Sequence, residues 1–143
     1  MAFDCNLATF GFPYDKELST PAEIAQWIST TTSIGESGRY LVELAGKGRF
    51  SAFDFPKKGF PPQLGEVVVT TRKPMAAKKV TASEVRTLVL SGRSALLVFG
   101  LGPRGLPADI FDMSQKHLDI TGRGLSLETC TALGAVVALL KGK

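Results

Sequence analysis

Two short apolar runs and two stretches of helical periodicity make up the first part of the chain. Asn6–Phe12 is apolar, rich in aromatic residues and short enough for a buried strand, and it ends at Pro13. The spacing of apolar residues predicts helices over Pro21–Thr30 and Ser37–Ala45. Arg49–Asp54 predicts a short second strand, because a loop rich in proline and glycine follows it.

The remaining residues continue this alternation of strands and helices. Runs rich in valine and leucine predict strands over Glu66–Thr71, Ala95–Phe99 and His117–Thr121. The predicted helices are one capped by Ser83 and ended by Gly92, one over Leu106–Ser114, and one from Leu125 or Ser126 to Leu140. Five strands alternating with helices predict an α/β fold with a largely parallel five-stranded sheet and helices on both faces.

The final predicted helix is apolar on nearly every face. A helix with one side in water carries polar residues along that side. We therefore expect this helix to be buried, either within the domain or against a second subunit in a homodimer.

Length and composition favour one soluble domain over residues 1–143. No run approaches the ~18 apolar residues of a transmembrane helix. The N-terminus also lacks the basic flank and cleavage site of a signal peptide, so we expect a cytoplasmic protein. Cys5 and Cys130 are the two cysteines and His117 is the one histidine, which excludes a disulfide scaffold and a zinc site. We expect reduced thiols, no metal and no membrane partner.

The charge balance is mildly basic, with 17 Lys and Arg against 13 Asp and Glu. This excess suits a polyanion such as RNA, and it equally suits an ordinary protein with a few surplus lysines. Lys57 and Lys58 lie beside two phenylalanines in the proline-rich loop, a mixture that suits nucleic acid, although solvated lysines are the commoner meaning. Arg72 and Lys73 follow a predicted strand, at the end where open α/β sheets bind ligands.

Gly100–Gly105 spells G-x-G-x-x-G after a predicted strand, with Asp119 nineteen residues beyond Gly100. The dinucleotide-binding fingerprint is thus formally present, and a nucleotide-binding oxidoreductase is one hypothesis. We reject it, because that fold places the loop after its first strand and needs several further strands and helices. Pro103 also removes a backbone donor from the loop. The glycines still allow the backbone to approach a ligand closely.

Three motifs in order resemble one known family. They are Leu97–Leu106 (LVFGLGPRGL), Leu118–Gly122 (LDITG) and Leu125–Gly134 (LSLETCTALG). Together they resemble the SPOUT superfamily of S-adenosylmethionine-dependent RNA methyltransferases, and most closely a small, mainly archaeal group within it. The resemblance implies a deep trefoil knot over about 94–143, a homodimer, S-adenosylmethionine as cofactor, and tRNA or rRNA as substrate.

The resemblance also implies a set of site residues. Those expected to hold the cofactor, mostly through backbone groups, are Phe99, Gly100, Gly102, Gly105, Leu106, Ile120, Thr121, Gly122, Leu125, Ser126, Leu127 and Cys130. Those expected to bind RNA are Lys57, Lys58, Arg72, Lys73, Arg104 and Arg123. Each arginine either holds an RNA phosphate or is an ordinary solvated arginine. Arg104 and Arg72 are the weak catalytic candidates, since methyl transfer requires positioning and at most one base.

Two positions depart from the family pattern. Enzymes of this superfamily that methylate ribose commonly have glutamate where this chain has Gly102, and asparagine where it has Glu128. Ribose 2′-O chemistry is therefore in doubt, and a non-catalytic module that binds RNA or S-adenosylmethionine is the alternative function. We expect His117 to be structural and Cys130 to be a small buried residue near the site.

Overall fold

A computed structural model describes residues 4–12, 18, 20–33, 35–101 and 104–142. Contacts between residues divide the chain into two compact units, Met1–Lys57 and Lys58–Lys143, and each is described by itself. No helix in the described part of the chain is long and apolar enough to cross a membrane.

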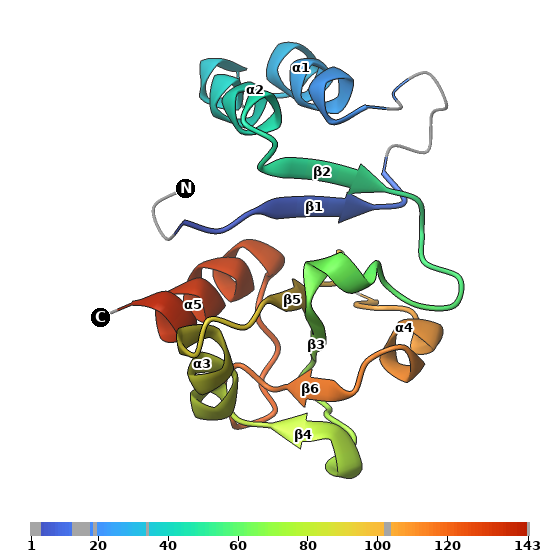
Figure 1. Ribbon diagram of the computed structural model, residues 1–143, viewed down its shortest axis with the longest axis vertical. Coiled ribbons are helices and arrows are strands. Elements are labelled where there is room, and N and C mark those ends of the chain that lie inside the picture. The colour runs from blue at the N-terminus through green and yellow to red at the C-terminus, as the bar shows by residue number, and fades with distance from the viewer. Residues whose placement is uncertain (1–3, 13–17, 19, 34, 102–103, 143) are drawn as a thin grey trace. The chain divides into compact units, whose positions relative to one another are not determined.

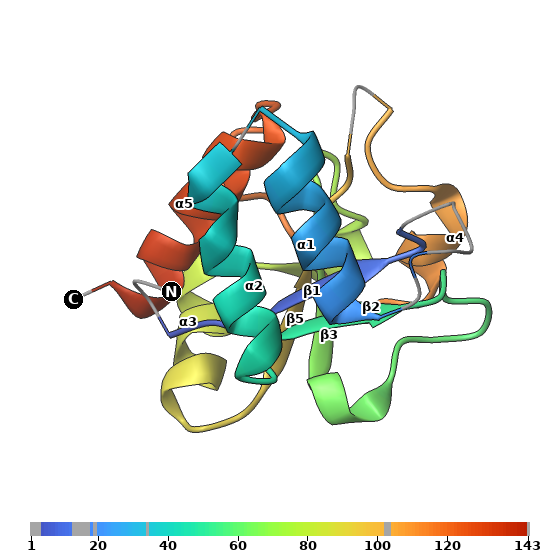
Figure 2. The same ribbon diagram turned by 90° about the horizontal axis from the view of Figure 1, so that it is seen from above.

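The first unit is a two-stranded parallel sheet with two helices over one face (Figures 1 and 2). β1 (Leu7–Phe10) pairs with β2 (Phe50–Phe53), with Leu7 opposite Phe50. The helical segments are α1 (Pro21–Thr31), a 3₁₀ turn η1 (Gly35–Gly38) and α2 (Arg39–Gly46). Ile24, Ala25, Leu44 and Phe50 form the buried core between the helices and the sheet.

The start of α1 is fixed by local chemistry. The Thr20 hydroxyl accepts a hydrogen bond from the Glu23 backbone N–H, and the Glu23 carboxylate accepts one from the Thr20 N–H, both at 3.2 Å. This reciprocal capping box satisfies two of the donors that a helix N-terminus leaves unpaired. Pro21 occupies the first helical position, where its missing N–H costs nothing. The predicted start at Pro21 is confirmed.

The second unit contains a four-stranded, wholly parallel sheet in the order β4-β6-β3-β5. Its strands are β3 (Glu66–Thr70), β4 (Lys79–Val80), β5 (Ala95–Val98) and β6 (Lys116–Leu118). Its helices are α3 (Ala82–Leu90), α4 (Ala108–Asp112) and α5 (Thr129–Lys141), with 3₁₀ turns η2 (Pro62–Leu64) and η3 (Ala76–Lys78).

Helices cover both faces of this four-stranded sheet. Val68 and Leu118 point to the face that α3 and α5 cover, where they form a core with Val85, Val136 and Leu140. His117, the neighbour of Leu118 along β6, points the opposite way, and its ring meets Phe111 of α4 at a centroid distance of 5.5 Å. The α/β class with parallel strands and helices on both faces is therefore present in this unit.

The sheet organisation differs from the prediction. The described strands form sheets of two and four strands, where the sequence predicted one sheet of five. An apolar run indicates that a strand is buried, but its pairing partner is chosen by contacts far away in sequence, which the pattern does not encode. The two-residue strand β4 was missed because it is too short to show any periodicity.

Several element boundaries also differ from the prediction, and those of α3, β6 and α5 have a clear cause. α3 begins at Ala82 behind Thr81, which forms a second capping box with Glu84, so Ser83 lies inside the helix and is not its cap. β6 ends at Leu118, because the chain turns at Asp119. α5 begins at Thr129, not at Leu125 or Ser126, and the residues before it are outside any helix.

Candidate functional site

Three loops leave the second sheet at the same edge, where the parallel strands β3, β5 and β6 end. Two hydrogen bonds join the ends of the strands from which these loops begin. The Thr70 hydroxyl donates to the Val98 carbonyl (3.0 Å), and the Thr71 N–H donates to the Leu118 carbonyl (2.9 Å). We call the loops 71–75, 99–107 and 119–128 the loop edge. Carboxyl ends of strands are where open α/β sheets bind ligands.

The glycine loop 99–107 folds back on its own backbone at Gly100. A Cβ atom on Gly100 would lie 2.6 Å from the Gly105 carbonyl carbon and 2.7 Å from the Leu106 nitrogen, far inside contact distance. Gly105 has a φ of +67°, a conformation that side chains other than glycine rarely adopt. Both glycines are therefore required for the loop to close, independently of any ligand. Gly102 lies outside the described residues.

α5 is joined to this loop by one side chain. The Thr129 hydroxyl, in the first turn of the helix, donates to the Gly100 carbonyl at 3.1 Å. The helix has no side-chain cap of its own, because Glu128 at the N-cap position makes no capping hydrogen bond. The bond from Thr129 consequently fixes where the helix meets the glycine loop.

The loop 119–128 is organised around one carboxylate. Asp119 accepts hydrogen bonds from the Thr121 N–H (3.1 Å), the Thr121 hydroxyl (2.9 Å) and the Gly124 N–H (2.7 Å). Partial burial tends to raise the pKa of this carboxyl, but the hydrogen bonds from Gly124 and Thr121, with the nearby N–H of Gly122, outweigh it and leave the pKa below its ordinary value. Asp119 is therefore a carboxylate held charged by its own loop. The rejected fingerprint and the LDITG motif both contain Asp119, but neither indicated this role.

Most of the predicted cofactor residues lie on two of these loops. Phe99, Gly100, Gly105 and Leu106 follow β5, while Ile120, Thr121, Gly122, Leu125, Ser126 and Leu127 follow β6. The side chains of Phe99 and Ile120 pack against the buried core, so these two residues offer a ligand mainly their backbone.

Three large apolar side chains at the loop edge are exposed. Leu101 is 81% exposed and Leu125 is 54% exposed, with Leu127 at 37%. Large apolar side chains in contact with water mark surfaces that bind a ligand or a partner. Cys130 is exposed on α5, so the expectation that it is buried was wrong. It lies on the helix face opposite to Ala132 and Val136, which point into the core.

Four of the predicted RNA-binding residues lie on the three loops of the loop edge. Arg72 and Lys73 follow β3, Arg104 follows β5 and Arg123 follows β6, and all four are exposed. The first and third loops are in contact, since a Cβ on Gly124 would lie 3.5 Å from the Arg72 carbonyl. Within the described residues none of these four side chains forms an ion pair.

The other two predicted lysines are divided between the units. Lys57 ends the first unit and Lys58 begins the second, and both are exposed. Neither lysine belongs to one of the three loops of the loop edge.

Charge is distributed unequally between the two units. Residues 58–143 contain twelve Lys and Arg against six Asp and Glu, whereas residues 1–57 contain five against seven. The basic excess of the chain thus belongs entirely to the second unit. The sequence already contains this difference in charge, but the difference can be recognised only when the boundary between the units is known.

His117 has a structural role. It is fully buried, its Nδ1 accepts a hydrogen bond from the Met75 N–H at 3.1 Å, and its Nε2 lies 3.3 Å from the Phe111 carbonyl. The ring therefore connects β6 to α4 and to the segment before η3, in agreement with the interpretation made from the sequence.

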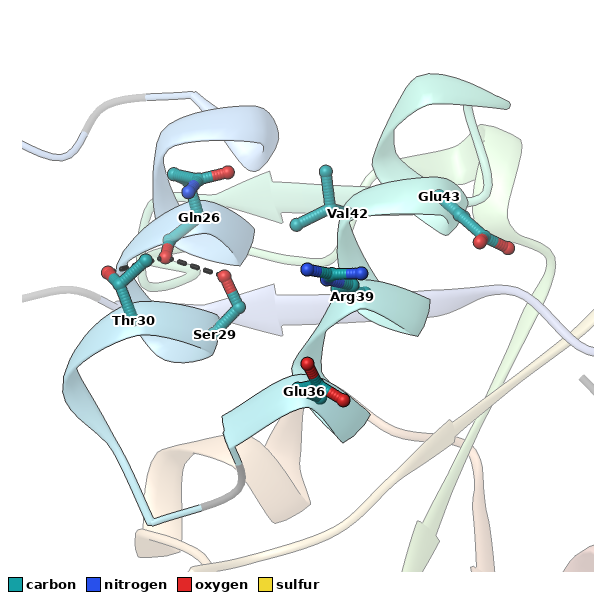
Figure 3. Close-up of a pocket in the computed structure, with 7 residues that line it drawn as sticks. All are labelled: Gln26, Ser29, Thr30, Glu36, Arg39, Val42 and Glu43. Carbon is teal, nitrogen blue, oxygen red and sulfur yellow. Dashed lines mark hydrogen bonds between the residues drawn. The ribbon is translucent and has the colours of Figure 1, made fainter.

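A hollow that no sequence signal indicated lies in the first unit, between α1, η1 and α2 (Figure 3). It has a volume of about 610 Å³ and is lined by Gln26, Ser29, Thr30, Glu36, Arg39, Val42 and Glu43. The Ser29 and Thr30 hydroxyls donate to the Gln26 carbonyl at 2.8 and 2.9 Å, so the helix itself occupies them. The hollow contains none of the predicted site residues.

Comparison with protein families gives a match over residues 1–141 to the model described as "Protein of unknown function (DUF531)". The chain belongs to the DUF531 family. This DUF531 chain is also 39% identical over 139 residues to a protein of Methanocaldococcus jannaschii named "Uncharacterized protein MJ0224". The alignment covers 97% of this chain and 75% of that relative. The relationship to an archaeal protein agrees with the mainly archaeal group that the motifs resemble.

Proposed function

We propose that this DUF531 protein is an S-adenosylmethionine-dependent RNA methyltransferase of the SPOUT type, acting on tRNA or rRNA. The observation that carries the proposal is the joining of three loops at one edge of a parallel sheet. The hydrogen bonds from Thr70 to Val98 and from Thr71 to Leu118 bring the roots of these loops together. Two of the loops contain the motifs on which the resemblance rests.

The cofactor lies on the glycine loop and the loop 119–128. Leu101, Leu125 and Leu127 supply exposed apolar contacts for an adenine ring, and the loop backbones supply hydrogen bonds. The trefoil knot over about 94–143 is part of this proposal. When bound, the cofactor supplies an electrophilic methyl group on a sulfonium, which becomes a neutral thioether as the acceptor atom of the RNA takes the methyl.

RNA lies against the basic side chains of the second unit. Arg72, Arg104 and Arg123 are exposed on three adjoining loops. Guanidinium groups without protein partners can each hold a phosphate, which positions the nucleic acid without reading its sequence. Arg72 and Arg104 are the candidates for contact with the nucleotide that is methylated.

The active form is a homodimer that buries α5. The inner face of this helix packs on the core through Ala132, Val136 and Leu140. Its outer face nevertheless carries Leu133 and Leu139 at 38% and 46% exposure. A second copy that covers this face removes these side chains from water.

Two measurements test the proposed function. Calorimetry should give micromolar binding of S-adenosylhomocysteine, about −8 kcal/mol, and no binding of nicotinamide dinucleotides. Transfer of labelled methyl from S-adenosylmethionine to total RNA, followed by mass spectrometry of the nucleosides, should identify the product. Binding without transfer would support the non-catalytic module, and preference for the dinucleotide would contradict the proposal.

A further inference from the structure

Five consecutive backbone N–H groups at the loop edge are bonded within their own loop. The groups of Thr121 and Gly124 donate to the Asp119 carboxylate at 3.1 and 2.7 Å, and that of Gly122 donates to the Asp119 carbonyl at 3.1 Å. The groups of Arg123 and Leu125 both donate to the Thr121 hydroxyl at 3.2 Å.

Two side chains therefore hold four of the five N–H groups, and the Asp119 carbonyl holds the fifth. The Thr121 hydroxyl accepts hydrogen bonds from two backbone N–H groups and donates its own to the Asp119 carboxylate at 2.9 Å. The ionised carboxylate has no proton to donate, so it can only accept, and it does so from three donors. Its charge is what allows one side chain to hold three donors at once.

Carbonyl groups of the same loop, unlike its N–H groups, are not hydrogen-bonded within the loop. The carbonyl oxygens of residues 121–124 accept no hydrogen bond from any residue in the described part of the chain. Residues 122–125 are exposed. The backbone of this loop thus offers acceptors to a ligand and offers no donors. It differs from loops that cradle phosphate, which present N–H groups.

We propose that Asp119 and Thr121 are positioning residues that make the loop 119–125 selective for adenine through its exocyclic amine. This inference rests on the proposed function. The amine donates to the free carbonyls, and the exposed side chains of Leu125 and Leu127 supply apolar contact to the ring. A phosphate would meet carbonyl oxygens here and be repelled. RNA phosphates are therefore held by the side chains of Arg72 and Arg123, not by the backbone of this loop.

A pair of ligands tests the selectivity on the full-length protein. S-adenosylhomocysteine carries the amine, and S-inosylhomocysteine has a carbonyl oxygen in its place. Calorimetry should show the first binding at least about tenfold more tightly, because the second sets an acceptor against an acceptor. Equal affinity for the two ligands would overturn this inference and leave the proposed function intact. Absence of binding by either would overturn both.

Variants test whether Asp119 and Thr121 create that selectivity. Asp119→Asn turns an N–H₂ toward at least one of the three donors, and Thr121→Val removes the hydroxyl. Each should weaken S-adenosylhomocysteine binding about tenfold and move the ratio of the two affinities toward one. Thr121→Ser keeps the hydroxyl and should restore the ratio.

Asp112→Asn is the matched control, since Asp112 is an exposed carboxylate on α4, and it should bind as the parent does. Circular dichroism shows whether each variant is folded. If Asp119→Asn does not fold, the comparison of Thr121→Val with Thr121→Ser decides. A ratio unchanged in the folded variants would mean that the two residues only stabilise the loop, and would overturn the inference.

Discussion

At the scale of single residues, the backbone of Ser94 determines that position 65 must be glycine. A Cβ on Gly65 would lie 2.2 Å from the Ser94 carbonyl oxygen, the same oxygen that accepts the Glu66 N–H at 3.0 Å. The φ of Gly65 is also +97°. The requirement arises from the pairing of β3 with β5, whose paired residues are 29 positions apart in sequence, so no local pattern indicates it.

We predict that Gly65→Ala lowers the free energy of unfolding by about 2 kcal/mol or more, because both the positive φ and the close approach of Ser94 oppose a side chain. Thermal and urea unfolding measure the change. Gly59→Ala is the control, since Gly59 has open space where the Cβ would lie and should change stability by less than about 1 kcal/mol. Similar decreases in the two variants would contradict this account of Gly65.

Asp119 makes stability depend on pH. Its pKa in the folded protein is below its ordinary value of 3.8, so the folded state favours the charged form. The stabilisation is therefore complete above pH 3.8 and is lost as the pH falls below 3.8 through the folded-state pKa. We predict that the melting temperature of the parent exceeds that of Asp119→Asn at pH 6 and that the gap narrows toward pH 3. A gap that is constant over this range would show that the charge is not what matters.

At the scale of elements, the starts of α1 and α3, which have a capping box, were predicted to within two residues, whereas the start of α5 was not. α1 and α3 each follow a threonine with a glutamate three residues later, the local signature of a capping box. α5 follows Glu128, which makes no cap, and its first turn is bonded instead to Gly100, 29 residues earlier. Its start was predicted three or four residues too early for that reason.

The glycine loop yields a prediction at this scale. Gly100→Ala should abolish binding of S-adenosylhomocysteine, because the loop cannot close against Gly105 and Leu106. Two causes of lost binding can be distinguished: a loop that cannot close, and a methyl group that clashes with the ligand. Hydrogen exchange over residues 99–107 should be faster in the variant even without ligand. Unchanged exchange in a variant that no longer binds would mean that the added methyl clashes with the ligand itself. Gly46→Ala, with open space at its Cβ, is the control.

At the scale of the whole molecule, the excess of basic residues belongs to the second unit, and so does the last helix with its exposed leucines. Its twelve basic residues against six acidic ones contrast with the first unit. Its last helix keeps exposed leucines. The basic excess suggests where a polyanion binds, and the exposed leucines of the last helix suggest where another copy of the chain binds.

We predict that neutralising Arg72 and Lys73 together weakens RNA binding and lowers the slope of log affinity against log salt by roughly one to two, since each RNA phosphate that a side chain neutralises adds about 0.7–0.9 to that slope. Filter binding at several salt concentrations measures it. Arg39→Ala with Lys47→Ala removes the same charge from the first unit and should leave the slope unchanged. If both double variants lower the slope equally, RNA binding depends on the net charge of the protein and not on Arg72 and Lys73 in particular.

We predict that the protein is a dimer in solution and that Leu133→Glu dissociates it, since a carboxylate cannot enter an apolar interface unpaired. Light scattering at micromolar concentration should give twice 15.3 kDa for the parent and 15.3 kDa for the variant. Leu90→Glu, on α3, changes a leucine that is 65% exposed and should stay dimeric. A parent of 15.3 kDa would refute the dimer.

The sequence by itself determined the class of fold, the approximate position of five strands and most helices, and the two loops that carry the motifs. These follow from local chemistry: apolar periodicity, a proline at the start of a helix, and glycines at turns. Tertiary structure decided how the strands group into sheets, where α5 begins, and why Gly100 and Gly65 are glycine. It also decided that Asp119 and Thr121 hold the N–H groups of their loop. Each of these depends on atoms brought together by folding, and the hydrophobic pattern of a chain carries no record of such partners.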